Sequence, residues 1–197
     1  MVWCSAFAAN GFLIRVRVVA YFRKMRGTSR GSPPRVSWSE VFWSWLGAFL
    51  GIAAVAWLEQ LFLSDVGLIL VIGSFGASAV LIYGAPKSPL AQPRNLLGGH
   101  VLSALVGVGA GLLLRGQPWL AAALAVSLAI AVMHLSRTLH PPGGATALIA
   151  VVGGPEVHSL GFLYALVPVA LGAIIMLSVA LLINNVAATR RYPEFWL

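Results

Sequence analysis

The stretch that decides the fold is His140-Pro-Pro-Gly-Gly-Ala-Thr-Ala-Leu148, which lies within almost wholly apolar sequence. Two prolines followed by two glycines are unfavourable inside an ordinary membrane-spanning helix. Backbone groups without helical partners are tolerated at membrane depth only where protein or a water-filled cavity surrounds them. The stretch therefore predicts a broken helical segment buried inside a membrane protein.

The composition of the 197-residue chain also predicts a membrane protein. Hydrophobic residues make up 59% of it and charged residues 9%, and the mean hydropathy is +0.91. A soluble domain of this length needs more charge to cover its surface. The net charge is +8, but no basic and aromatic patch accompanies it, so nucleic acid is not an expected partner. With a single cysteine, Cys4, a disulfide within the chain and a cysteine metal site are excluded.

Six apolar segments predict an all-α polytopic membrane bundle. We divide the chain into a basic cytoplasmic N-terminal arm (1–38), a transmembrane domain (39–185) and a short cytoplasmic tail (186–197). The arm either contains a helix at the membrane surface or serves as an organelle-targeting segment. The expected segments are 41–63, 66–84, 96–114, 119–136, 143–152 and 160–183.

The distribution of basic residues predicts the orientation. If all six segments cross and the N-terminus is cytoplasmic, Arg115 is the only basic residue on the outer side. A model with four crossings would place Lys87 and Arg94 outside, which the positive-inside rule disfavours. We therefore expect six segments with cytoplasmic termini in a bacterial inner membrane, or alternatively in a chloroplast envelope.

An internal similarity predicts a duplication. Gly76-Ala77-Ser78 resembles Gly144-Ala145-Thr146 at an offset of 68 residues, and the segments around them follow in the same order. Each unit would contain a span, a glycine-interrupted segment and a span. Three crossings per unit would invert one unit relative to the other, as in many transporters that bind solutes at interrupted helices.

These interrupted segments predict a binding site for a small inorganic anion. Helix N-termini offer free amides and a positive dipole, and hydroxyl groups add donors, whereas carboxylates are nearly missing from the apolar segments. Lys87 and Arg94 would attract anions at the cytoplasmic mouth. Each feature also has a purely structural interpretation, as close helix packing, internal hydrogen bonding or a topology signal. The candidate binding residues are Ser74, Gly76, Ser78, His100, His140, Gly143, Gly144 and Thr146.

Two other classes of function remain as alternatives. A membrane-embedded enzyme would need a nucleophile, a base or a metal set, and the scattered histidines provide no such set, so we expect no catalytic residue, metal or cofactor. A structural or regulatory membrane subunit would explain the small-residue faces 47–54 and 99–111, which also suit contacts between copies in a homo-oligomer. It would leave the Pro and Gly breaks beside polar groups unexplained.

The motifs resemble those of the HPP family of integral membrane proteins. The resemblance rests on His140–Leu148, Phe75–Leu81, Gly84–Asn95 and Gly98–His100, and it covers about residues 39–185. Family members are usually described with four spans, and plant and cyanobacterial members are linked to nitrite transport. The resemblance therefore implies passage of a small anion across a lipid bilayer, with nitrite as the named candidate.

Overall fold

The regular elements of the described residues are all helical. The computed structural model describes residues 21–25, 31–62 and 71–197, and it divides into two compact units, Met1–Val36 and Ser37–Leu197. The second unit contains the helices α2 (Trp38–Phe62), α3 (Gly73–Gly84), α4 (Pro93–Leu113), α5 (Pro118–Leu135), α6 (Pro141–Val152), α7 (Pro155–Leu160) and α8 (Leu171–Val186). In the first unit, residues 21–24 are helical, and most of the predicted N-terminal arm lies outside the described residues.

Proline marks the beginning of four of these helices. Pro93, Pro118, Pro141 and Pro155 each occupy the first turn of a helix. The fixed φ angle of proline suits this position, and its missing N–H would have no partner within the helix there. Helices α4, α5 and α6 therefore begin earlier than the hydropathy of the sequence predicted, because the prolines belong to the helices and not to the loops.

Two of the apolar helices are too short to cross a membrane alone. Four helical stretches have the length and hydropathy of membrane spans, namely 38–62, 93–113, 118–135 and 155–186. In contrast, α3 and α6 have 12 residues each, which is about 18 Å of helix against a hydrocarbon core of about 30 Å. The all-helical membrane bundle is thus confirmed, with four candidate spans. The count of six membrane crossings stays a prediction.

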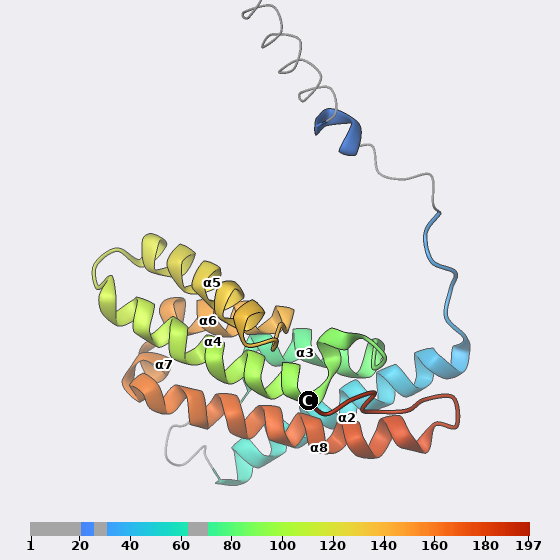
Figure 1. Ribbon diagram of the computed structural model, residues 1–197. Coiled ribbons are helices and arrows are strands. Elements are labelled where there is room, and N and C mark those ends of the chain that lie inside the picture. Colours follow the sequence, from blue (N-terminus) through green and yellow to red (C-terminus); the bar gives the residue numbers. More distant parts are fainter. Residues whose placement is uncertain (1–20, 26–30, 63–70) are drawn as a thin grey trace, which may run out of the picture. The chain divides into compact units, whose positions relative to one another are not determined.

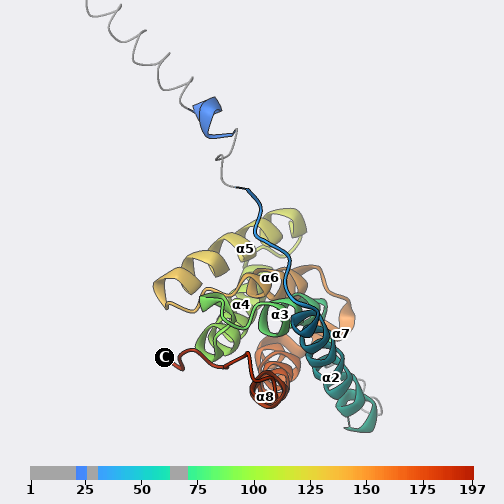
Figure 2. The same ribbon diagram turned by 90° about the vertical axis from the view of Figure 1, so that its right-hand side faces the viewer.

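The short helices α3 and α6 lie side by side in opposite directions. Ser74 near the start of α3 contacts Thr146 in the middle of α6, whereas Ser78 contacts His140 at the beginning of α6. In both views of the ribbon, α3, α4 and α6 lie between α5 and the pair formed by α2 and α8 (Figures 1 and 2). The two interrupted segments are therefore placed at the centre of the bundle.

The other helices alternate in direction along the chain. Gly99 of α4 packs against His140 and Gly107 against Ala147, so α4 runs parallel to α6. Asn184 of α8 donates to the carbonyl of Ile82, whereas Gly172 faces Phe75, so α8 runs parallel to α3. With Glu59 of α2 accepting from the amide of Val71, α2 runs opposite to α3. This alternation is the arrangement that a duplicated, inverted unit requires, although the duplication itself stays a prediction.

Glycine faces allow the close packing that the sequence predicted. The Tyr83 ring lies against Gly47 and Gly51 of α2, where any side chain would overlap it. A Cβ atom added to Gly107 of α4 would lie 2.8 Å from the Ala147 Cα atom of α6. Without a hydrophobic driving force between helices in lipid, such close approach supplies the packing energy.

Pro168 interrupts the last span. Residues 161–165 form a 3₁₀ helix (η3), and residues 166–170 form a π-type turn (η4) in which Val167 has non-helical dihedral angles. The regular helix α8 resumes at Leu171. The turn η3 carries Tyr164 to the centre of the bundle, where its hydroxyl donates to the Thr146 carbonyl over 3.2 Å.

Candidate functional site

Helix α3 contributes two hydroxyl groups to the centre of the bundle. Ser74 and Ser78 are four residues apart, so they lie on the same face of the helix one turn apart. Both side chains are fully buried. In the interior of a membrane protein, buried polar groups are costly and need partners, and the partners of these two come from α4 and α6.

Helix α6 contributes His140 and Thr146. The interruption before α6 places His140 at the N-cap position in an extended conformation, ahead of Pro141. Its Nδ1 atom donates to the carbonyl oxygen of Leu90 over 2.9 Å, and its Nε2 atom lies 2.9 Å from Ser78 Oγ. Because a carbonyl oxygen can only accept, the Nδ1 atom of His140 carries a proton.

His100 of α4 joins the two short helices. Its Nε2 atom lies 2.6 Å from Ser78 Oγ, and its Nδ1 atom lies 2.6 Å from Thr146 Oγ1. Thr146 Oγ1 also lies 2.9 Å from Ser74 Oγ and 3.3 Å from the Pro142 carbonyl oxygen. Ser78 and Thr146 are the two hydroxyl residues that the internal similarity pairs, and one imidazole ring bridges them.

These residues form one continuous hydrogen-bonded chain, which we call the hydroxyl–imidazole cluster. The two imidazole rings have centroids 5.0 Å apart, and Phe75 packs edge-on against His100 with a centroid separation of 5.4 Å. In the part of the chain that the structure describes, no carboxylate is hydrogen-bonded to either ring. The members of the cluster, all with no exposed surface, are Ser74, Ser78, His100, His140 and Thr146.

The three glycines predicted to bind an anion lie outside the cluster. Gly76 is exposed, and a Cβ atom there would meet open space; Gly144 faces Val126 of α5. The physical reason is the helical period, because residues two positions apart point to nearly opposite sides of a helix. Gly76 therefore cannot share a face with Ser78, nor Gly144 with Thr146. Gly143 is buried, but its role is packing, with Gly99 O and Ser103 Oγ each 2.8 Å from an added Cβ atom.

Lys87 and Arg94, the predicted mouth of the site, occupy the end of the bundle where α4 begins. Lys87 is exposed and lines a cavity of about 220 Å³, which we call the Arg190 pocket. Arg94 is half-buried, and its Nε atom has no hydrogen-bond partner within the described residues. The other residues that line the Arg190 pocket are Glu40, Gly84, Ala85, Pro86, Ser88 and Arg190.

Arg190 is a buried residue whose importance the sequence did not indicate. Its guanidinium forms an ion pair with Glu40 at the start of α2, with an N–O distance of 2.8 Å. It also donates to the carbonyl of Tyr83 at the end of α3 and to Asn184 of α8. The tail therefore closes the bundle at this end. Nearby, the hydroxyl of Tyr192 donates to the Ala91 carbonyl, and burial raises the pKa of that hydroxyl.

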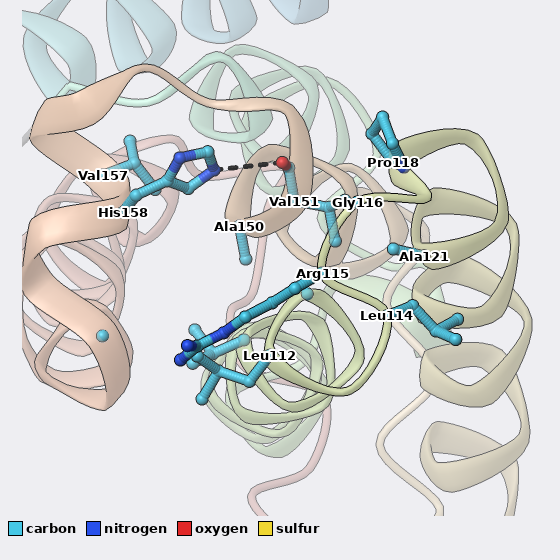
Figure 3. A pocket seen from close by; sticks show the side chains of 13 residues that line it. Leu112, Leu114, Arg115, Gly116, Pro118, Ala121, Ala150, Val151, Val157 and His158 are labelled. Carbon is cyan, nitrogen blue, oxygen red and sulfur yellow. Dashed lines mark hydrogen bonds between the residues drawn. The ribbon is translucent and has the colours of Figure 1, made fainter.

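A larger cavity opens at the opposite end of α4. This Arg115 pocket has a volume of about 550 Å³ and is mostly apolar. Figure 3 shows the Arg115 side chain extending across it and His158 donating to the Val151 carbonyl over 3.0 Å. Ala150 of α6 also lines the pocket and lies one helical turn from Thr146, or about 6 Å. The cluster is thus separated from the cavity by the contact of Gly107 with Ala147 and Ala150.

The described residues offer no constellation for a metal. No group of three or more His, Cys, Asp or Glu side chains among them is placed to hold an ion. The donors at the centre of the bundle are hydroxyl and imidazole groups, and the nearest phenol, Tyr164, donates to a backbone carbonyl.

The fold and the buried cluster define a polytopic helical membrane protein. The chain belongs to the HPP family: the family model described as "HPP, transmembrane region" matches residues 33–193. Two transmembrane proteins of Dictyostelium discoideum are similar to it. One is 50% identical over 93% of this chain and 59% of its own length, and the other is 47% identical over 96% of this chain and 68% of its own length. No solved structure matches the chain.

Proposed function

We propose that this protein carries a small inorganic anion across its membrane, with nitrite as the first candidate. The observation that supports this most strongly is the hydroxyl–imidazole cluster, which is buried at the crossing of two half-length helices. Polar groups at membrane depth mark solute pathways because the cost of burying them is otherwise uncompensated. Interrupted helices that meet at such groups are the usual plan of a transporter binding site.

The chemistry of the cluster favours an anion over a cation. Hydroxyl and imidazole N–H groups donate hydrogen bonds to anions, and a cation site would be built from carboxylates or carbonyl groups facing a cavity. Of the five acidic residues in the sequence, none belongs to the cluster. Nitrite enters as the candidate because other members of the family are linked to its transport.

The proposed path runs from the Arg190 pocket to the Arg115 pocket. The Arg190 pocket lies beside the start of α4 and the Arg115 pocket at its end, with the closed cluster between them. The Arg115 pocket is lined by the guanidinium of Arg115, and the Arg190 pocket by Lys87 beside the Arg190–Glu40 ion pair. Cavities with positive charge raise the local concentration of anions. A path that is open at both ends and closed in the middle suits a carrier whose cluster opens to one side at a time.

We propose that the Arg190 pocket faces the cytoplasm. Lys87, Arg94, Arg137 and Arg190 all lie at that end of the helices, whereas Arg115 lies at the other. The positive-inside rule then orients the bundle with its C-terminus in the cytoplasm. The bacterial inner membrane and the chloroplast envelope stay predictions, and both similar proteins come from Dictyostelium.

The test is nitrite flux into liposomes that contain the purified protein. We expect a flux above that of empty liposomes of the same lipid, with nitrate and formate tested alongside to define selectivity. No flux of any of the three anions above the empty-liposome rate would contradict transport and favour a structural or regulatory subunit. Release of a chemically altered anion would instead favour a membrane-embedded enzyme.

A further inference from the structure

We infer that the hydroxyl–imidazole cluster takes up a proton together with the anion, so that the two cross the membrane as a pair. This inference rests on the proposed function and adds the coupling ion to it. It follows from the directions of the hydrogen bonds in the cluster, which begin at the Leu90 carbonyl oxygen because this atom can only accept.

The first step fixes the neutral arrangement. His140 donates through Nδ1 to the Leu90 carbonyl, so with one proton on its ring its Nε2 atom must accept from Ser78. Ser78 has only one hydroxyl proton, and His100 must therefore donate to it through Nε2. With a single proton, His100 then accepts at Nδ1 from Thr146, and in this state Thr146 cannot also donate to Ser74 or to the Pro142 carbonyl, the two bonds in which it is the donor.

The second step adds one proton. If His100 gains a proton on Nδ1, that atom donates to Thr146 Oγ1 across the same 2.6 Å. Thr146 is then free to donate its own hydroxyl proton to Ser74 across 2.9 Å. The neutral cluster lacks this bond, so the added proton completes the hydrogen bonding of the cluster. A hydrogen bond left unmade between buried polar groups is costly.

Protonation also creates a buried charge, because the protonated ring of His100 carries a full positive charge and has no exposed surface. The groups around it are His140 on α6, Phe75 and Ser78 on α3, and Tyr164 on η3, whose hydroxyl donates to the Thr146 carbonyl. Arg94 lies six residues earlier on the same helix. In the described residues no carboxylate is bonded to the cluster, so a buried cation here requires an anion as its partner.

The last step joins the two events. Because Ser74 accepts from Thr146, its own hydroxyl proton can point to a bound anion. The anion gains a positive charge only in the protonated cluster, and the proton gains its counter-charge only when the anion is bound. By linkage, each then increases the affinity for the other. The complex of cluster, proton and anion carries no net charge, which suits movement across a membrane.

The experiment measures nitrite and protons in the same liposomes. Nitrite uptake and the pH of a trapped indicator dye are followed while potassium and valinomycin set the membrane potential, and the flux of empty liposomes is subtracted. We expect one proton to enter with each anion, a flux that rises with an inward proton gradient, and no dependence on the potential. Nitrite flux that depends on the potential and moves no protons would overturn the coupling while leaving anion transport intact. Absence of any flux would overturn the proposed function as well.

A variant tests the ring directly. His100→Gln keeps donor and acceptor atoms on a side chain of similar reach but cannot gain a proton. We expect its proton movement to fall to the level of empty liposomes, whereas His134→Gln, at an exposed position on α5, keeps the coupling. If His100→Gln fails to fold, proton uptake by the purified wild-type protein in weakly buffered detergent decides the question. Uptake of protons on addition of nitrite supports the coupling, and no uptake overturns it.

Discussion

Ser78 Oγ lies 2.6 Å from His100 Nε2 at the centre of the membrane domain. The hydroxyl also contacts His140, so a single serine of α3 connects an imidazole of α4 with one at the start of α6. One polar side chain therefore connects α3 with the next long helix, α4, and with the start of α6, 62 residues further along the chain. The proposed transport path passes through this connection, and the predictions that follow test its parts.

Replacing Ser78 by Ala should disconnect the two rings. Because His100 and His140 would each lose a buried partner, we expect the free energy of unfolding to fall by about 1–3 kcal/mol and nitrite flux to fall with it. Thermal unfolding in detergent and liposome flux measure the two effects. Ser127→Ala on α5 is the control, since this exposed hydroxyl donates only to the Leu124 carbonyl. Equal flux in the two variants would contradict a role for Ser78.

Gly76 and Gly143 should respond oppositely to alanine. Gly76 faces open space on an exposed helix position, so alanine should leave flux unchanged and stabilise α3 by about 0.5–1 kcal/mol. Gly143 is enclosed by α4 and α5, and alanine there should lower stability by about 1–3 kcal/mol through overpacking. Thermal unfolding distinguishes the two. Loss of flux in a folded Gly76→Ala protein would instead support an anion site at the amides of α3.

Arg190 should be essential for stability although it lies in the tail. Replacing it by Met leaves Glu40 without its ion-pair partner and the Tyr83 carbonyl without a donor. We expect a loss of about 1–3 kcal/mol, mainly from the buried carbonyl and amide groups left without a donor, because the remaining carboxylate of Glu40 is 30% exposed. Arg191→Met, at the exposed neighbouring position, should change stability little. Similar unfolding temperatures for the two variants would show that the contacts of Arg190 contribute little.

Arg115 should accelerate entry of anions from its side of the membrane. Arg115→Gln removes the guanidinium from the 550 Å³ pocket, and we expect a lower initial rate of nitrite flux at low ionic strength. The difference from wild type should shrink at high salt, because salt screens exposed charges. Arg137→Gln, an exposed arginine outside that pocket, is the matched control. A rate effect that is independent of salt would point to a structural role for Arg115.

The sequence predicted the elements of this fold better than their contacts. Hydropathy located the four long helices and the short α6, because each is a continuous local pattern. The segment expected at 66–84 contains α3, which is shorter and begins at Gly73. The starts of the helices were wrong where Pro93, Pro118 and Pro141 occupy a first turn. The assignment of Gly76 and Gly144 to the anion site rested on free amides at helix starts and stays a prediction, although the helical period turns both glycines away from Ser78 and Thr146.

Long-range contacts explain what sequence reasoning missed. His100 and His140 were named as candidates, but their shared contact with Ser78 depends on the antiparallel packing of α3 and α6, which no local pattern encodes. Arg190 was interpreted as a topology signal, since its partner Glu40 lies 150 residues away. The only sign of this contact in the sequence was Glu40, an isolated acidic residue at the start of the first span, because the tail carries the opposite charge on Arg190 and Arg191.

Nitrite flux through liposomes that contain the Thr146→Val protein shows whether the anion passes through the hydroxyl–imidazole cluster. The variant keeps the shape of the side chain but removes the hydroxyl that joins His100 to Ser74, and Thr189→Val, which loses only an exposed bond to Glu40, is the control. We expect Thr146→Val to fold and to move nitrite far more slowly than wild type, while Thr189→Val retains the wild-type rate. A folded Thr146→Val protein with the wild-type rate would show that the anion does not pass through the hydroxyl–imidazole cluster.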